Sequence, residues 1–220
     1  MRRLAEHGSK NLINSSGGML RALVAAAALG GALLALPALA ADTVEVAGVK
    51  YESPQDVGGA KLQLNGAGIR YKAVFKVYTA GLYLSAAANS PEAVAANNGP
   101  KRLHIVALRD IDGNDLGKLF TQGIQNNATR EEFMKAINGI TRIAGIFSTK
   151  SKLNTGENFT VDYIPGTGTQ VLVNGKPSGE PIKEAEFYNV FLKIWLGKSP
   201  ADDQLKDALL GIKREARQRG

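Results

Sequence analysis

The stretch that decides the fold is Leu64–Leu84, LNGAGIRYKAVFKVYTAGLYL. Its second half is rich in β-branched and aromatic residues, which predicts a strand. The part Val77–Leu84 carries no charge, so we expect this strand to be covered on both faces. The glycines before Arg70 predict a turn, and a second turn near Ala73 would fold the strand of Arg70 back beside the following strand.

The position of Arg70 leaves two interpretations open. Alternation places Arg70 on one face with Lys76 and Tyr78, whereas Thr79 and Tyr83 lie on the other face. In the first interpretation Arg70 is an ordinary solvated charge, as most arginines are. In the second it is a cation at the mouth of a pocket. Periodicity alone does not choose between them.

The order of elements indicates an α+β domain. Thr129 and Glu132 are spaced as a capping box, and the pair Asn174-Gly175 marks a tight turn. Strands come first and helices follow in blocks, which favours helices packed on one face of a largely antiparallel sheet. The predicted elements are strands at 43–50, 60–68, 69–74 and 75–85, a helix at 90–99, a strand at 101–109, helices from 112 and at 130–140, strands at 158–164 and 169–175, and helices at 184–198 and from 199.

The first 41 residues have the pattern of an export signal behind a polar extension. A positive start at Arg21 precedes the apolar run Ala22–Leu36, and the small residues that end at Ala41 suit a signal peptidase. The apolar run is shorter than the ~20 residues that a membrane span needs. We therefore predict a start at Met19, residues 42–220 as a single domain without an integral membrane segment, and a periplasmic or secreted location.

Composition excludes several kinds of chemistry. The chain has no cysteine, so disulfides, thiol catalysis and thiolate metal sites are ruled out. His104 is the only histidine after residue 41, which leaves little basis for a catalytic triad. Asp110–Asp115 lacks the glycine of a calcium loop, and the basic excess collects in the tail Lys213–Arg219 rather than on the fold. We expect no metal, no cofactor and no nucleic-acid partner.

Two blocks of the sequence resemble a known family. Gly66–Leu84 and Phe187–Gly211 are similar, in order and spacing, to the chalcone isomerase superfamily, and more closely to its exported bacterial chalcone isomerase-like branch. The resemblance extends from about Val46 to Gly211. It implies an open-faced sandwich, in which a long antiparallel sheet carries helices on one face and a ligand cleft lies between them.

The resemblance also implies site residues. Arg70 matches the cleft arginine of the family and Thr79 its cleft threonine, and these two would be catalytic if the protein is an isomerase. The sequence departs from the family elsewhere. Leu116, Leu119 or Phe120 stands where the family has a helix tyrosine; Gly123 replaces the family's asparagine, and Ile194 and Trp195 occupy the late polar position.

The remaining pair suits an anionic ligand better than catalysis. The planar donors of Arg70 match a carboxylate, and some members of the superfamily bind fatty acids. Our first hypothesis is a non-enzymatic binder of a fatty acid or similar amphipathic anion. The residues predicted to bind it are Arg70, Tyr78, Thr79, Tyr83, Leu116, Phe120 and Ile124.

Two alternatives remain open. One is an isomerase, an intramolecular lyase, that acts on a ring-closing substrate. The other is a structural protein whose cleft is filled by its own side chains, with Arg70 paired internally to Asp162 or Glu186.

Overall fold

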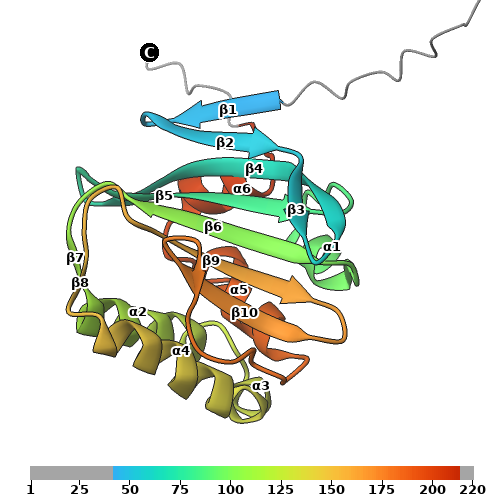
Figure 1. Cartoon of the computed structure of the whole chain (residues 1–220), viewed down its shortest axis with the longest axis vertical. Coiled ribbons are helices and arrows are strands. Elements are labelled where there is room, and N and C mark those ends of the chain that lie inside the picture. Colours follow the sequence, from blue (N-terminus) through green and yellow to red (C-terminus); the bar gives the residue numbers. More distant parts are fainter. Residues whose placement is uncertain (1–41, 214–220) are drawn as a thin grey trace, which may run out of the picture. The chain divides into compact units, whose positions relative to one another are not determined.

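The computed structural model of the chain describes residues 42–213, so the predicted signal peptide lies outside the described residues. Within 42–213, seven strands form one antiparallel sheet (Figure 1). Their order is β11 (Lys176–Pro177), β10 (Gly168–Val173), β9 (Asn158–Ile164), β6 (Lys101–Ala107), β5 (Phe75–Leu84), β4 (Ala60–Lys72) and β3 (Gln55–Val57).

The helices collect on one face of this sheet, which confirms the predicted α+β fold class. Figure 1 shows α5 (Phe187–Leu196) and α6 (Asp203–Leu209) behind the sheet, with α2 (Gly113–Gln125) and α4 (Ile137–Thr149) side by side below them. The remaining elements are the helices α1 (Pro91–Ala96) and α3 (Arg130–Lys135), the hairpin of β1 (Asp42–Val46) and β2 (Val49–Ser53), and the short pair β7 (Ile111–Asp112) and β8 (Lys152–Leu153).

Strand β5 is buried on both faces from Tyr78 to Leu84, as its uncharged sequence predicts. Tyr78 and Leu82 belong to the large core formed with the helices. Tyr83, which points the other way, packs with Tyr51 of β2 in a smaller cluster. The β1–β2 hairpin therefore covers part of the face that the helices leave open.

The turn predicted before Arg70 does not form, because β4 runs without a break from Ala60 to Lys72. Gly66 and Gly68 instead let α6 approach the strand. A Cβ at Gly66 would overlap the carbonyl oxygen of Ala208, and one at Gly68 would overlap the Ala208 methyl group. These glycines therefore serve close packing between strand and helix.

Two helix boundaries also differ from the predictions. The predicted helix at 130–140 is divided at Ala136 into α3 and α4, although the capping box of Thr129 and Glu132 is present as expected. The last helix begins after Asp202 rather than Ser199, because the Asp202 carboxylate accepts the backbone N–H groups of the first turn.

Candidate functional site

Arg70 and Tyr78 lie side by side on the helix-covered face of the sheet. They are direct cross-strand partners between β4 and β5. A register irregularity follows between Arg70 and Tyr71, close to the turn at Ala73 and Val74. The structure thus brings together two of the predicted site residues, near the end of the sheet where the hairpin turns.

The hydroxyl of Tyr78 is held by Trp195, the penultimate residue of α5. The indole Nε1 of Trp195 donates a 2.8 Å hydrogen bond to the Tyr78 hydroxyl oxygen. Burial raises the pKa of Tyr78 to about 12, although the hydrogen bond from Trp195 and the charge of Arg70 act in the opposite direction. The phenol is therefore neutral at physiological pH, and it can donate its proton to an acceptor.

The nearest carboxylate to Arg70 belongs to Asp202, not to Asp162 or Glu186 as the structural alternative expected. Nη1 of Arg70 lies 4.0 Å from Oδ2 of Asp202, and the two side chains are 22% and 11% exposed. The same Oδ2 accepts the backbone N–H of Tyr71 at 2.9 Å. Asp202 thus caps α6 and ties it to β4.

That ion pair leaves the arginine available. A separation of 4.0 Å is the outer limit of a salt bridge and far from a bidentate pair. Asp162 makes the close pair instead, with Nε and Nη2 of Arg102 at 2.8 and 2.7 Å from its two carboxylate oxygens. Arg70 is therefore a half-buried guanidinium whose donors still suit an incoming anion.

Thr79 and Tyr83 do not share this site. They lie on the opposite face of β5, where the Tyr51 hydroxyl donates a 2.7 Å hydrogen bond to Thr79 Oγ1. Thr79 is fully buried under the β1–β2 hairpin. The predicted group of polar residues is thus divided by the sheet, and Tyr78 rather than Thr79 stands beside Arg70.

The predicted apolar lining is part of the packed core. Leu116, Phe120 and Ile124 are 2%, 3% and 0% exposed. The ring centroid of Phe120 lies within 5.4–5.9 Å of four other aromatic rings, those of Phe147, Phe159, Phe191 and Trp195. A ligand tail could reach these residues only if this aromatic cluster opened.

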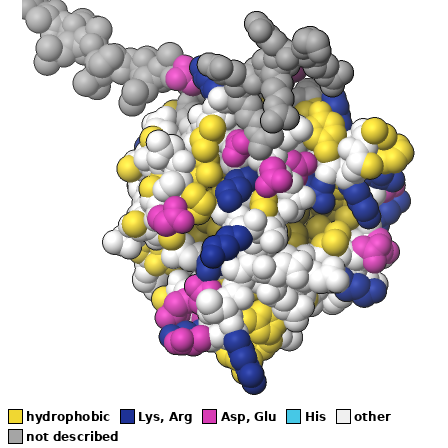
Figure 2. Space-filling model, turned by 180° about the vertical axis from the view of Figure 1, so that it is seen from behind, with side chains coloured by type: hydrophobic (Ala, Val, Ile, Leu, Met, Phe, Trp, Pro, Cys, Tyr) yellow, Lys and Arg dark blue, Asp and Glu magenta, His cyan; other side chains and the backbone are white. Residues whose placement is uncertain are grey.

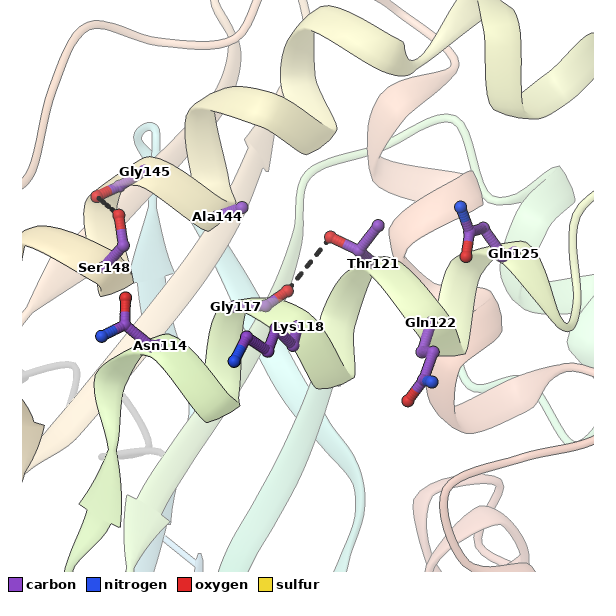
Figure 3. Close-up of a pocket in the computed structure, with 9 residues that line it drawn as sticks. All are labelled: Asn114, Gly117, Lys118, Thr121, Gln122, Gln125, Ala144, Gly145 and Ser148. Atoms are coloured by element: carbon purple, nitrogen blue, oxygen red, sulfur yellow. Dashed lines mark hydrogen bonds between the residues drawn. The ribbon is translucent and has the colours of Figure 1, made fainter.

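A hollow of about 520 Å³ lies elsewhere, between α2 and α4 (Figure 3). Two of its polar side chains are engaged within their own helices, since Thr121 Oγ1 donates to the carbonyl of Gly117 and Ser148 Oγ to that of Gly145. None of the predicted site residues lines it. This groove offers no charged anchor besides Lys118.

A second hollow, of about 460 Å³, lies on the face of the sheet away from the helices. Arg102, His104 and Tyr83 line it together with residues of β2 and β10. The pKa of His104 is lowered to about 4, mainly by burial and also by the charge of Arg102. Nδ1 of His104 lies 2.9 Å from Thr160 Oγ1, and the lowered pKa leaves the imidazole neutral at physiological pH.

Sequence reasoning missed two residues that define the site. In the sequence, Trp195 stands out only as a departure from the family's polar residue, and the last helix is predicted to begin at 199, with no role assigned to Asp202. The substitution of an indole for the family's late polar residue was a usable signal, because a buried tryptophan N–H requires an acceptor.

The fold and the site define an α+β open-faced sandwich with an arginine at the edge of its core. A family model described as chalcone isomerase-like matches residues 43–211, and the chain belongs to this family. A fatty-acid binding protein of Arabidopsis thaliana has a similar crystal structure, with a TM-score of 0.57 and 14% sequence identity over 77% of this chain and 96% of that one. No curated protein sequence matches the chain. At 14% sequence identity, this structural similarity establishes the fold alone.

Proposed function

We propose that the protein is a non-enzymatic binder of a fatty acid or similar amphipathic anion, exported to the periplasm. The observation that carries this proposal is the half-buried Arg70 beside the Tyr78 hydroxyl, with its nearest carboxylate 4.0 Å away. The similar fold of the Arabidopsis fatty-acid binding protein supports the proposal.

The head group would be bound by donors from two strands. The guanidinium of Arg70 offers parallel N–H groups to a carboxylate, and the neutral hydroxyl of Tyr78 supplies a further donor. Trp195 holds that hydroxyl in place, since its Nε1 donates to the oxygen and leaves the phenol proton for the ligand. Charge-assisted hydrogen bonds of this kind contribute about 1.5–3 kcal/mol each.

The tail would lie among the aromatic residues next to the head group. Because Phe120 and Trp195 are packed together, the tail enters only when the cluster rearranges. The helix α5, which carries both Phe191 and Trp195, is the element that must move. Binding therefore changes the surroundings of Trp195, and the ligand replaces the core contacts that it displaces.

The chain contains a single tryptophan, so its fluorescence reports on this site directly. Delipidated protein is titrated with oleate below its micelle concentration, and with oleyl alcohol as a matched ligand without charge. We expect a saturable change of the Trp195 emission with oleate, and a much weaker response to the alcohol.

The variant Arg70→Ala should bind oleate at least about tenfold more weakly, because the charged head group loses its anchor. Arg130→Ala removes an exposed arginine of α3 and serves as the charge-matched control. Equal oleate affinity of Arg70→Ala and Arg130→Ala would refute the proposed anchor, and no saturable response of the wild type would refute the binding function.

A further inference from the structure

The tip of the β4–β5 hairpin exposes two neighbouring apolar side chains. Val74 is 82% exposed and Phe75 is 59% exposed. The other large apolar residues exposed in the described part of the chain are isolated in sequence; they are Val44, Leu119, Met134 and Ile212. Adjacent exposure of a valine and a phenylalanine at a protruding turn is unusual for a soluble surface and indicates contact with another apolar phase.

The turn itself is not built from the residues that favour folding. Two-residue hairpin turns prefer Asn, Asp and Gly, because their central residues adopt positive φ. Here Ala73 has a φ of 53°, a conformation that costs free energy for a residue with a Cβ. A β-branched valine follows it. The residues of this tip therefore make the turn less stable than Asn or Gly would, and they expose an apolar surface.

Cations surround the two apolar side chains. Lys72 and Lys76 flank them in sequence and are exposed, and the guanidinium carbon of Arg109 lies 5.5 Å from the centre of the Phe75 ring. Within residues 42–213, no salt bridge joins any of these three cations to an acid. Figure 2 shows hydrophobic side chains beside Lys and Arg side chains at a protruding edge of the molecule.

The neighbouring acid does not cancel this charge. Asp110 follows Arg109 directly, but its carboxylate is 2.7 Å from Nζ of Lys152 and also accepts the backbone N–H of Thr155. The tip thus combines an apolar point with a ring of unpaired positive charge. Apolar side chains that enter the acyl region, together with cations at the level of the head groups, are the features of proteins that bind anionic bilayers.

We propose that the segment Lys72–Lys76, together with Arg109, docks the protein on the surface of a bilayer that contains anionic lipid, with Val74 and Phe75 inserted at the interface. None of the described helices has the length and hydropathy of a membrane span. Arg70 lies three residues before Ala73, about 10 Å along the strand. Docking would bring the candidate head-group site close to the lipid, an aspect that rests on the proposed function.

The test uses the mature protein and vesicles of equal parts phosphatidylglycerol and phosphatidylethanolamine, with vesicles of phosphatidylcholine as the uncharged comparison. Co-sedimentation measures the bound fraction. We expect binding to the anionic vesicles, a loss of at least about tenfold in the partition coefficient for the double variant Val74→Ser/Phe75→Ser, and a similar loss for Lys72→Gln/Lys76→Gln. Added salt should weaken the wild type and have little effect on the lysine variant.

The control variant is Met134→Ser on α3, which removes an apolar residue of similar exposure, 58%, from a surface that also carries Glu131 and Glu132. It should bind the vesicles as the wild type does. Because the chain has no cysteine, Val74→Cys can carry an environment-sensitive dye, whose emission should shift to shorter wavelength on the anionic vesicles.

Three results would overturn the proposal. The dye at position 74 could keep its aqueous emission on the vesicles, or Val74→Ser/Phe75→Ser could bind them as well as the wild type. Sedimentation velocity could also show a dimer that the same double variant dissociates, without vesicle binding, which would make the tip an interface between copies. Failure of the oleate proposal remains distinguishable, since the tip variants should bind oleate normally and Arg70→Ala should bind vesicles normally.

Discussion

The indole Nε1 of Trp195 donates a 2.8 Å hydrogen bond to the hydroxyl of Tyr78, although the two residues are 117 positions apart in the chain. This bond links the last turn of α5 to β5 at Tyr78, which is the direct cross-strand partner of Arg70 on β4. It fixes the phenol next to the guanidinium. The stability of the core and the geometry of the candidate site therefore depend on the same pair.

Tyr78→Phe should destabilise the protein by about 1–3 kcal/mol, because the buried indole N–H would lose its acceptor. The same change removes a proposed ligand donor, so the affinity for oleate should fall as well. Urea denaturation and oleate titration measure the two effects. Tyr71→Phe, on a half-buried tyrosine next to Arg70, is the control, and equal behaviour of both variants would contradict the role given to Tyr78.

Gly66→Ala should destabilise the protein by about 1–3 kcal/mol, because its methyl group would overlap the backbone of α6 at Ala208. Gly145→Ala is the matched control, since a Cβ at Gly145 meets no atom within 4 Å. That control lies inside α4 and should be neutral or stabilising by up to about 1 kcal/mol. Thermal unfolding compares the two, and a Gly66→Ala protein as stable as the wild type would show that α6 does not pack on β4 as described.

His104 should make the fold less stable in mild acid. Its pKa in the folded protein is about 4 and its ordinary value is 6.5, so the unfolded chain binds the proton first as the pH falls. Stability contributed by the neutral imidazole is present above pH 6.5 and is lost between about 6.5 and 4, with a slope of at most about 1.4 kcal/mol per pH unit.

Urea midpoints of the wild type and His104→Gln, compared between pH 7.5 and 5, check this prediction. Above pH 5 the carboxylates with lowered pKa, such as those of Asp110 and Glu157, contribute little, because they and their unfolded counterparts are both ionised. As the pH falls from 7.5 to 5, the wild type should lose more stability than His104→Gln, so its urea midpoint should fall relative to that of the variant. Parallel curves would mean that His104 is not protonated on unfolding.

Lys101 should respond to alkaline pH in the same sense. Its side chain is buried, its Nζ donates to Asn189 Oδ1 at 3.1 Å, and burial lowers its pKa to about 8. Because the unfolded lysine keeps its proton to about pH 10.5, the wild type should gain stability relative to Lys101→Met between pH 8 and 10. Chemical denaturation at these pH values measures the difference, and a constant difference would contradict the lowered pKa.

Local pattern predicted the features that depend on neighbours in sequence. The uncharged run of β5 predicted burial on both faces, and alternation placed Arg70 with Tyr78. The same alternation separated Thr79 from Arg70, yet the family resemblance grouped them, and the structure follows the alternation. In this case strand geometry was the better guide to which side chains share a face.

Features that depend on distant segments could not be predicted. From the local sequence, Gly66 is typical of a turn. Its role in packing depends on α6, which comes from the far end of the chain and contacts the strand at this glycine. The partner of Arg70 could not be chosen among several acids, because Asp162 and Asp202 differ only in the element that carries them and in where that element packs. The closure of the aromatic cluster around Phe120 likewise depends on side chains from α2, α4, α5 and β9.

The most direct test of Arg70 as a ligand anchor is native mass spectrometry of residues 42–220 purified from bacterial cells, beside the same chain with Arg70→Ala and with Arg130→Ala. The account predicts an adduct with the mass of a long-chain fatty acid on the wild type and on Arg130→Ala, and its loss from Arg70→Ala. An adduct retained by a folded Arg70→Ala protein, or none on any of the three after incubation with oleate, would contradict it.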